Sequence, residues 1–301
     1  MKRQPRIDPS GTSDWSDFIQ LAKPRIVGMV LVTAATGFLV ASPSWTGFAL
    51  WGRLALMLLG TGLAAAGAAV LNNYLERDID ARMARTRMRA LPAGRIEPAA
   101  ALAFGVLLVL GGVSLLATAV NLLAAFLVLL TAFLYVIVYT PLKRVTWLNT
   151  PIGAIPGALP PMVGWAAAAG DLSPGAWVLF GILYLWQHPH FYAIAWMYRT
   201  DYAEAGFKML SVIDPTGRRV FRQAILFSLA LIPVSIALTA MGLAGRLYLI
   251  GAVFLGAALL AASLHLAQHQ RHADARRVLL TSVVYLPLLL VLIVLDAGLA
   301  R

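Results

Sequence analysis

Apolar residues dominate the chain in nine long stretches, and short polar segments separate them. These segments carry Gly, Pro or charged residues, as in SPSWTG at 42–47 and AGDLSPG at 169–175. A helix needs about 20 predominantly apolar residues to cross the hydrocarbon core of a bilayer. The pattern therefore predicts an all-α integral membrane protein whose nine transmembrane helices cover residues 25–41, 50–72, 98–118, 121–139, 150–168, 175–197, 223–241, 246–266 and 278–297.

The composition supports this class of protein. Of the 301 residues, 60% are hydrophobic and 12% are charged, whereas a soluble domain carries about a quarter charged residues. The absence of cysteine excludes a disulfide framework, a thiolate metal site and a Cys nucleophile. No apolar run follows the first basic residues, so we expect no signal peptide. We predict a polar cytoplasmic segment at 1–20 and a single membrane domain at 21–301.

Basic residues are distributed unevenly between the two sides of the predicted bundle. Twenty-one of the 24 Lys and Arg lie on the side of the N-terminus, and the exceptions are Arg53, Arg246 and Arg301. Loops rich in Lys and Arg stay in the cytoplasm. The N-terminus is therefore predicted inside and the C-terminus outside. This distribution explains the net charge of +11 without a nucleic-acid partner, and we predict none.

Acidic residues also avoid the middle of the predicted helices. They gather at the cytoplasmic ends, mainly in the segments 76–80 and 201–204. Pumps and ion-coupled transporters keep ionisable groups at mid-membrane depth. This placement disfavours transport.

The first acidic segment follows the second predicted helix. If that helix continues, Asn72, Glu76 and Asp80 at i, i+4 and i+8 lie on one face. Asn73 stands beside them, whereas Asp78 points nearly opposite. Oxygen ligands one turn apart suit Mg²⁺, which proteins often hold through one or two carboxylates and substrate phosphates. A solvated, salt-bridged helix end is the alternative interpretation.

Basic and tyrosyl side chains near this segment add candidate phosphate ligands. Arg85, Arg87 and Arg89 follow directly, and Arg suits phosphate oxygens. Tyr139 and Lys143 lie one turn apart at the end of the fourth predicted helix and could supply a hydroxyl and a point charge. The alternative for this pair is an anchor at the membrane interface.

The second acidic segment, MYRTDYAEAGFKML at 197–210, follows the sixth predicted helix. Asp201 and Glu204 are at i and i+3 if the segment is helical. The two acidic segments lie on the same predicted side. We therefore expect that they face each other over a cavity and hold a diphosphate through two Mg²⁺ ions.

The five histidines form two groups. His188 and His190 flank a proline in the sixth predicted helix, where a hydrogen bond to a neighbouring helix is the alternative to a functional role. His265, His269 and His272 lie at helical spacing at the end of the eighth predicted helix. That spacing could bind a metal, and a solvated helix end is the competing interpretation.

Several segments together resemble the UbiA superfamily of intramembrane prenyltransferases. They are LNNYLERDIDARMARTRMRALPAG, YTPLKRVTWLNTPIGAIPGALPPMVGWAAAAG, WQHPHFYAIAWMYRTDYAEAGFKML, ARRVLLTSVVYLPLLLVLIVLD and LAKPRI. The similarity extends from about residue 18 over nearly the whole chain. Pro-His-Phe and Asp-Tyr-x-x-Ala-Gly are similar to the branch of this superfamily that farnesylates haem. Ala205 stands where the superfamily usually has a second Asp, and Ala90 and Lys208 stand where Pro is usual.

The resemblance implies a UbiA-type bundle that transfers the farnesyl group of farnesyl diphosphate to a vinyl group of haem B, with Mg²⁺ as cofactor. It implies catalytic roles for Asn72, Glu76, Asp80, Asp201 and Lys143, with the first four as metal ligands. It implies diphosphate contacts from Arg85, Arg89, Lys143, Tyr139 and Asn73. It implies haem contacts from His190 and His188. Candidates for cation–π stabilisation of the allylic carbon are Tyr135, Tyr139, Trp165, Tyr184, Trp186 and Trp196.

The resemblance further implies a bacterial cytoplasmic (inner) membrane location with the active site on the cytoplasmic side. Besides farnesyl diphosphate, haem B and the lipid bilayer, haem A synthase and terminal oxidase assembly proteins are candidate partners. Two alternatives stay open: prenylation of an aromatic quinone precursor, and membrane transport.

Overall fold

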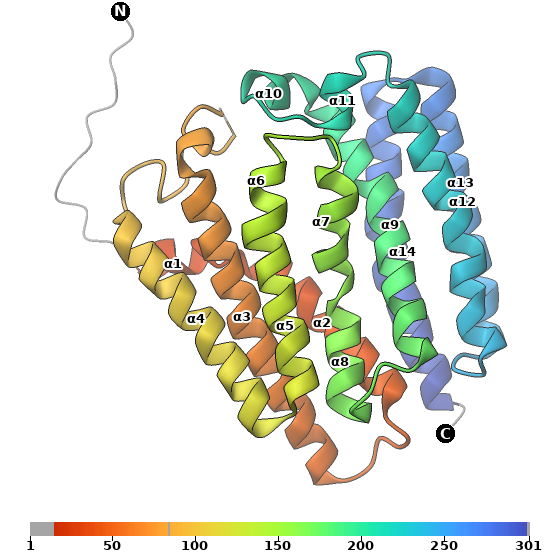
Figure 1. Cartoon of the computed structure of the whole chain (residues 1–301). Coiled ribbons are helices and arrows are strands. Elements are labelled where there is room, and N and C mark those ends of the chain that lie inside the picture. Colours follow the sequence, from red (N-terminus) through yellow and green to blue (C-terminus); the bar gives the residue numbers. More distant parts are fainter. Residues whose placement is uncertain (1–14, 84, 300–301) are drawn as a thin grey trace, which may run out of the picture.

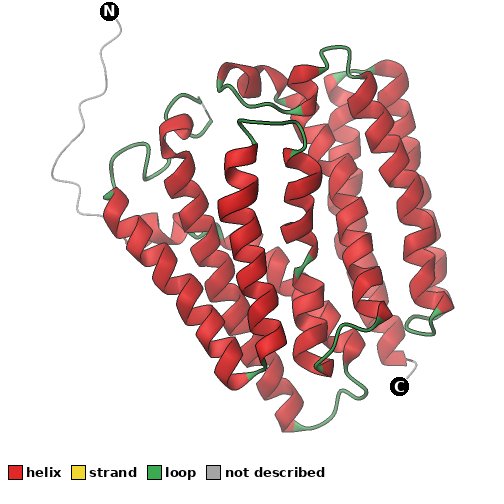
Figure 2. Cartoon of the chain, in the orientation of Figure 1, coloured by secondary structure: helices red, strands yellow, loops and turns green. Residues whose placement is uncertain are grey.

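The computed structural model describes residues 15–83 and 85–299, which form a bundle of helices (Figure 1). Figure 2 shows helices and loops and no strand in this part of the chain, so the predicted all-α class is confirmed. Most of the predicted polar segment at 1–20, and Arg301, lie outside the described residues. The helices are α1 Trp15–Leu21, α2 Pro24–Ala41, α3 Phe48–Asp80, α4 Pro98–Ala119, α5 Leu122–Phe133, η1 Leu134–Tyr139, α6 Thr140–Leu142, α7 Asn149–Ala158, α8 Pro160–Ala169, α9 Pro174–Met197, α10 Arg199–Glu204, α11 Leu210–Ile213, α12 Arg218–Ala240, α13 Arg246–His269 and α14 His272–Leu299.

Eight helical segments within the described residues are long and apolar enough to cross a membrane. One is continuous through α5, η1 and α6, and another combines α7 and α8. The predicted span at 175–197, the sixth of the nine, corresponds to α9, which is not among the eight. Its 24 residues give a length of about 36 Å, but Gln187, His188 and His190 interrupt its apolar sequence. The count of nine and the orientation in the membrane therefore stay predictions.

The helix α3 continues well past its apolar part. It has 33 residues and is about 50 Å long, so the predicted continuation through residue 80 is confirmed. Glycines let α3 approach α4 closely, because a Cβ on Gly60 or Gly67 would overlap α4 at Leu116 or at the carbonyl oxygen of Gly105. Small residues at such interfaces are common in membrane bundles. This packing fixes the helix that carries the first acidic segment.

The predicted span at 150–168 is two half-helices, α7 and α8, that meet at Leu159. Pro160 and Pro161 have no N–H to donate, so the hydrogen-bond ladder of one straight helix cannot continue there. Below the break, α8 packs closely on α2, where a Cβ on Gly37 would overlap the carbonyl of Pro161. The break leaves α7 free to line the interior of the bundle.

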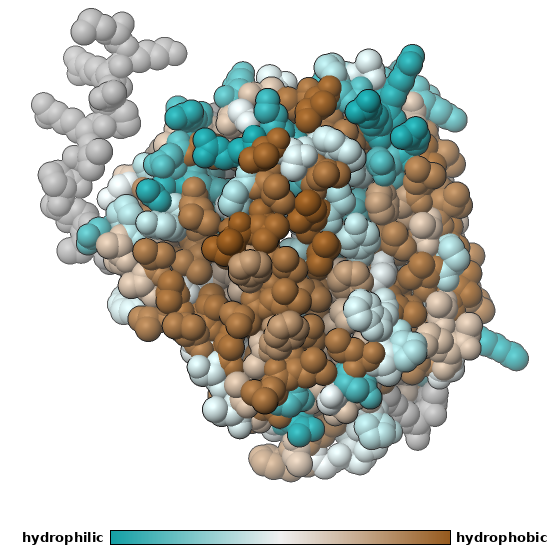
Figure 3. Space-filling view, in the orientation of Figure 1, coloured by the Kyte–Doolittle hydropathy of each residue, from teal (hydrophilic) through white to brown (hydrophobic). Residues whose placement is uncertain are grey.

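Apolar and charged residues separate on the surface. Figure 3 shows a broad apolar band around the middle of the molecule and hydrophilic residues gathered at one end. The turns after α3, α6 and α9, and the turn between α13 and α14, all lie at that end in Figure 1. The basic segments that are separated along the chain are thus neighbours in space. Which compartment this end faces is still predicted from the loop charges alone.

Candidate active site

A cavity of about 460 Å³ lies inside the bundle, within the range of small-molecule sites. One part of it is polar, and the rest is apolar. Polar and charged residues from the start of α2, from the end of α3 and its following turn, and from the segment of η1 and α6 line the polar part; they are Lys23, Asn72, Glu76, Asp80, Arg85, Thr86, Arg89, Tyr139 and Lys143. The apolar part includes Ala64, Ala65, Ala68, Val128, Ala132, Val163 and Leu183. The cavity therefore suits a ligand with a charged head and an apolar body.

The first acidic segment faces this cavity as its spacing predicts. Asn72, Glu76 and Asp80 are one helical turn apart on α3, are exposed by 7% or less, and all line the cavity. Asp78 lies on the opposite face, where its exposed carboxylate is 3.8 Å from Arg77. The helical period therefore directs Asn72, Glu76 and Asp80 into the cavity and Asp78 into solvent.

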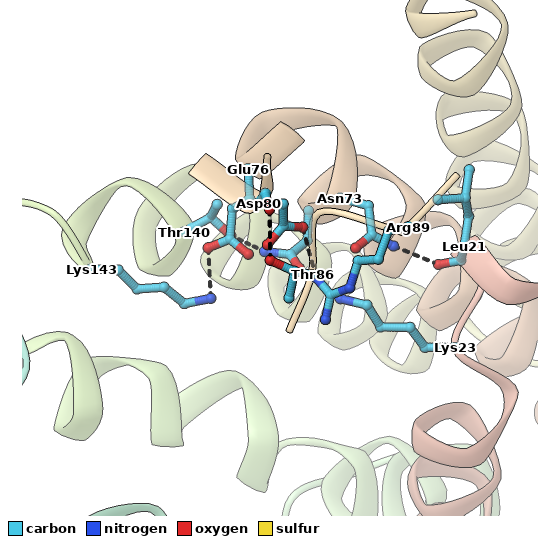
Figure 4. Close-up of polar contacts among 10 residues, drawn as sticks. Leu21, Lys23, Asn73, Glu76, Asp80, Thr86, Arg89, Thr140 and Lys143 are labelled. Atoms are coloured by element: carbon cyan, nitrogen blue, oxygen red, sulfur yellow. Dashed lines mark hydrogen bonds and ion pairs between the residues drawn. The ribbon is translucent and has the colours of Figure 1, made fainter. Parts of the chain in front are cut away.

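Both inward carboxylates are ion-paired (Figure 4). Lys143 Nζ donates to Glu76 Oε1 at 2.8 Å, and Arg89 Nη1 donates to Asp80 Oδ2 at 2.7 Å. The hydroxyl of Thr86 donates to the backbone carbonyl of Asp80 at 2.9 Å and holds the turn that returns Arg89 to the cavity. A buried carboxylate without a partner costs several kcal/mol. The pairs therefore stabilise the two charges in the absence of another cation.

The amide of Asn72 belongs to a hydrogen-bond chain across three segments. Lys23 Nζ donates to Asn72 Oδ1 at 2.8 Å, and Asn72 Nδ2 donates to Thr140 Oγ1 at 3.0 Å. The Thr140 hydroxyl donates in turn to the carbonyl of Tyr135 at 2.8 Å. This hydrogen-bond network holds the amide oxygen of Asn72 against the ammonium group of Lys23. It also links the start of α2 to α3 and to η1.

The polar part of the cavity carries a surplus of positive charge, because four cationic side chains line it against two carboxylates. Burial, together with the nearby charges of Lys143 and Arg89, lowers the pKa of Lys23 to about 8. Burial also opposes the charge of Lys143, but Tyr139 and Glu76 outweigh it and raise the pKa of this Lys. An anionic ligand would relieve the repulsion among these cations.

A π-helical turn brings two tyrosines to the cavity. Within η1, Tyr135 and Tyr139 stack with ring centroids 5.7 Å apart, and both line the cavity. Lys143 Nζ lies 4.6 Å from the centroid of the Tyr139 ring. A Cβ on Gly153 of α7 would overlap that ring, so this glycine makes room for it. Single π-helical turns are frequent at functional sites.

Asn73 does not face the cavity. Its Nδ2 donates to the carbonyl of Leu21 at 2.9 Å, and the residue is not among those that line the cavity. Figure 4 shows its side chain directed to Leu21, away from Glu76 and Lys143. The structure therefore does not bring Asn73 to the cavity, and its contact with a diphosphate stays a prediction. The physical reason is the turn of about 100° between adjacent helical residues; Asn73 fastens the end of α1 to α3.

The second acidic segment lies at the same end of the bundle but outside the cavity lining. Asp201 on α10 is half-buried and Glu204 is exposed, and neither lines the cavity. Tyr202 is the α10 side chain that does, and burial raises its pKa. The structure thus places α10 beside the cavity with its carboxylates turned from it. A metal-binding role for Asp201 stays a prediction.

The three arginines after α3 have different positions. Arg85 and Arg89 line the cavity, as predicted for diphosphate contacts, whereas Arg87 is exposed and does not. The guanidinium of Arg85 lies over the ring of Tyr198, 5.5 Å from its centroid. Arg85 also lines a second cavity of about 240 Å³ that shares Tyr139 with the first. Arg85 therefore stands where the two cavities meet.

The two histidines of α9 have different surroundings, and His190 lines the cavity. Its Nδ1 is 2.8 Å from Ser282 Oγ, whose hydroxyl donates to the carbonyl of Leu279 at 2.7 Å. Because that hydroxyl proton is used, His190 Nδ1 carries the proton and donates to Ser282. His190 Nε2 is then left with a lone pair. Trp186 stacks on the ring at 5.1 Å and also lines the cavity.

His188 is fully buried and does not line the cavity. Its Nδ1 is 2.7 Å from the carbonyl of Tyr184, and its ring stacks on Phe227 at 3.6 Å. This placement favours the packing interpretation for His188. Of the six aromatic residues predicted near a developing cation, the cavity is lined by Tyr135, Tyr139 and Trp186, and not by Trp165, Tyr184 or Trp196.

Lys23 also belongs to the site, although the sequence pattern did not predict a role for it. It precedes Pro24, has a left-handed backbone conformation with φ of 52°, and lies 49 residues from Asn72 in sequence. Only the motif LAKPRI could have indicated it, since a basic residue next to a helix start is usually solvated. The structure alone shows that it reaches the acidic segment.

The oxygens of α3 fit a hard divalent cation. An amide oxygen and two carboxylates on one buried face are the ligand types that Mg²⁺ takes, with remaining positions filled by water and phosphate oxygens. The three cationic side chains now paired with these oxygens could turn to an incoming phosphate group. The arrangement can thus hold a metal and an anion side by side.

Comparisons with known proteins agree with this geometry. Residues 30–289 match the model of the UbiA prenyltransferase family. The chain is 48% identical over 286 residues to a protoheme IX farnesyltransferase of Solibacter usitatus, covering 93% of this chain and 98% of the relative. It is 46% identical over 280 residues to a protoheme IX farnesyltransferase of Salinibacter ruber, with coverage of 93% and 98%.

Solved structures share the fold. A structure described as that of digeranylgeranylglyceryl phosphate synthase in membranes has a TM-score of 0.78 at 17% identity and covers 94% of this chain and 98% of its own. A UbiA homologue from Archaeoglobus fulgidus bound to DMAPP and Mg²⁺ has a TM-score of 0.65 at 16% identity, with coverage of 92% and 99%. At these identities the likeness concerns the fold alone.

Proposed function

The chain belongs to the UbiA prenyltransferase family, and on this premise we propose that it transfers the farnesyl group of farnesyl diphosphate to a vinyl group of haem B. The relatives at 46–48% identity over nearly their full length carry that activity in their names. The observation that carries the proposal is the row of Asn72, Glu76 and Asp80, each paired with a cation, at the polar part of an otherwise apolar cavity.

The polar part receives the diphosphate. Breaking the allylic C–O bond leaves both bonding electrons on the diphosphate, whose added charge needs fixed positive groups nearby. Asn72, Glu76 and Asp80, with Asp201 as a further ligand, would hold Mg²⁺, which neutralises charge on the diphosphate oxygens. Asp201 enters this set by its resemblance to the family motif, since it lies beside the cavity rather than in its lining.

The cationic side chains complete the diphosphate site. Lys143 and Arg89 hold Glu76 and Asp80 in the ligand-free protein. When a metal takes over these carboxylates, both cations are free to donate to phosphate oxygens. Lys23 and Arg85 line the same part of the cavity and add to the positive charge there. Lys143 and Arg89 therefore exchange a carboxylate partner for a phosphate partner, and the diphosphate also offsets the surplus positive charge of Lys23 and Arg85.

The apolar part receives the farnesyl chain. Ala64, Ala65 and Ala68 lie on the same helix as Glu76, nearer the N-terminal end of α3, and line the cavity there. Their small side chains leave a channel along α3 that excludes water from the allylic carbon. Tyr135 and Tyr139 line the cavity, and Lys143 lies over the ring of Tyr139; these aromatic rings can stabilise positive charge on that carbon.

The haem acceptor meets the allylic carbon on the α9 side of the cavity. The vinyl π electrons form the new C–C bond, and water then adds to the resulting cation and loses a proton, which gives a hydroxyethylfarnesyl group. His190 Nε2 carries a lone pair, and His190 is the cavity-lining histidine of α9. We assign it the haem-side contact, where it can accept that proton or approach the iron; Trp186 holds its ring by stacking.

Location and partners complete the proposal. The end of the bundle that carries the basic turns faces the cytoplasm, so the active site opens to the cytoplasmic side of a bacterial inner membrane. In this orientation α9 crosses the membrane as well as the eight other spans, the N-terminus is inside and the C-terminus outside. The farnesylated haem passes to a haem A synthase or to a terminal oxidase under assembly.

A two-acceptor assay tests the proposed function. The purified protein in liposomes receives farnesyl diphosphate and Mg²⁺ with equal amounts of haem B and 4-hydroxybenzoate, and mass-resolved chromatography identifies the products. We expect haem that has gained a farnesyl group and a hydroxyl group. A prenylated 4-hydroxybenzoate in its place would assign the acceptor to the quinone precursors, and the absence of both products would overturn prenyl transfer.

A further inference from the structure

A second cluster of metal-ligand side chains lies at the turn between α13 and α14. His265 and His269 are one turn apart at the end of α13, and Asp274 is in the first turn of α14. One ligand atom of each residue can be chosen so that all three lie within 4.8 Å of one another. None of the three lines the cavity described above. The cluster is therefore separate from the diphosphate site.

The hydrogen bonds favour, in both histidines, the tautomer that binds a metal through Nε2. His269 Nδ1 is 3.0 Å from the carbonyl of His265, and because a carbonyl can only accept, this nitrogen carries the proton. Arg277 Nη1 is 3.0 Å from His265 Nε2, and because a guanidinium can only donate, that nitrogen carries the lone pair. In its neutral form each ring therefore has its lone pair on Nε2, as a metal-bound imidazole requires, and in His265 this lone pair accepts from Arg277.

Asp274 supplies a buried carboxylate that can still accept a further contact. The residue is 3% exposed, and among the described residues its Oδ2 has no hydrogen-bond partner. Its Oδ1 lies 3.3 Å from His265 Nε2, which matches the spacing of about 3.3 Å between two ligands of a tetrahedral Zn²⁺. A buried carboxylate oxygen without a partner is costly. A bound cation would satisfy it.

Arg277 occupies the place that such a cation would take. Its Nη1 donates both to Asp274 Oδ1 and to His265 Nε2 at 3.0 Å. The Arg277 side chain is 63% exposed, so it can swing into solvent without burying an unpaired charge. The guanidinium is thus a replaceable substitute for a positive charge between two ligand atoms.

We propose that His265, His269 and Asp274 bind one divalent transition metal ion of the Zn²⁺ type, with Arg277 displaced and water completing the coordination. Two imidazoles and one carboxylate favour Zn²⁺ over Mg²⁺, which prefers oxygen ligands throughout. The ion joins the end of α13 to the start of α14. Trp196 of α9 donates to the carbonyl of Gln270 in the same turn at 3.3 Å, so the ion also steadies the turn against α9.

Zinc binding by equilibrium dialysis tests this site. The full-length protein in detergent is dialysed against Zn²⁺ in a large excess of Mg²⁺, which keeps the cavity site occupied, and bound zinc is measured by mass spectrometry. Wild type is expected to retain one equivalent and to unfold at a higher temperature than in Mg²⁺ alone. His265→Ala and Asp274→Asn are expected to lose both effects. His272→Ala, which changes an exposed histidine of the same turn, is the matched control and keeps them.

A second variant keeps the test informative if Asp274→Asn does not fold. Arg277→Gln removes the competing cation, so it is expected to bind Zn²⁺ several-fold more tightly than wild type. Co²⁺ should give visible d–d absorption in this variant and in wild type, and in neither once Zn²⁺ is added. The proposal is overturned if wild type retains no zinc above background, or if the His265→Ala and His272→Ala variants retain the same amount.

Discussion

The two acidic segments of this protein have similar composition and lie at the same end of the bundle, yet their surroundings differ. On α3, Glu76 and Asp80 are buried, line the cavity, and are paired with Lys143 and Arg89. On α10, Asp201 is half-buried and Glu204 is exposed, and neither lines the cavity. The first segment is built as a preorganised site, whereas the second is a surface helix beside it.

The lengths of the two helices explain this difference. The helix α3 has 33 residues and is packed along its length on α4, so each added turn keeps its side chains on a known face. The helix α10 has six residues between two turns, and its direction depends on the turns rather than on its own periodicity. A spacing of carboxylates therefore predicts a shared face only where a long packed helix carries it.

The largest expected effect concerns the α3 segment. Changing Glu76→Gln and Asp80→Asn together removes both carboxylates that hold the metal and leaves the cations without partners. Turnover of farnesyl diphosphate with haem B should fall by about 10³-fold or more. Asp78→Asn changes the solvated neighbour on the same helix and should stay within about two-fold of wild type. Equal losses in the two variants would show that the inward face has no special role.

The next effect concerns the cation opposite Glu76. Lys143→Met removes a buried positive charge at the diphosphate site, and turnover should fall by about 10²-fold, with a higher KM for farnesyl diphosphate. Arg144→Met alters the exposed neighbouring residue and is the matched control. Steady-state kinetics with varied farnesyl diphosphate measures both. A Lys143→Met enzyme with wild-type KM and kcat would remove Lys143 from the site.

A smaller effect is expected in the second acidic segment, on α10. Asp201→Asn should lower turnover about 10-fold, because Asp201 only supplements the ligands of α3. The exposed Glu204 should tolerate Ala within about two-fold. The Mg²⁺ concentration for half-maximal turnover, measured in both variants, separates ligand loss from other damage. Matching losses at the two positions would make the α10 segment a second metal site of equal weight.

The smallest effect concerns Asn73, which neighbours the α3 row but turns from it. Asn73→Ala removes the hydrogen bond to Leu21 and should lower the free energy of unfolding by about 1 kcal/mol. Thermal unfolding in detergent would detect the lower Tm. The KM for farnesyl diphosphate should not change. A rise in KM without a change in Tm would return Asn73 to the diphosphate site.

Much of the fold and the central row of the site could be predicted from the sequence. Nine apolar stretches defined the helical bundle, and the i, i+4, i+8 spacing defined the face shared by Asn72, Glu76 and Asp80, because both signals are local and periodic. The π-helical turn of η1 and the break at Leu159 arise from packing and proline geometry that a hydropathy pattern does not contain.

The rest of the site depends on contacts between distant segments. Lys23 reaches Asn72 across 49 residues of sequence, and no periodicity relates the two positions. The orientation of α10 and the separation of His190 from His188 depend on neighbouring helices. Asp274 joins His265 and His269 only because a two-residue turn folds α14 back onto α13. Such long-range placement requires the three-dimensional structure.

Equilibrium binding of a farnesyl diphosphate analogue that cannot ionise tests the central claim most directly. Titration calorimetry with farnesyl thiolodiphosphate, with and without Mg²⁺, should show Mg²⁺-dependent binding to wild type and to Asp78→Asn. The same titration should show no Mg²⁺-dependent binding to the Glu76→Gln, Asp80→Asn double variant. Mg²⁺-dependent binding of unchanged affinity in a folded double variant would contradict the assignment of the α3 row as the metal–diphosphate site.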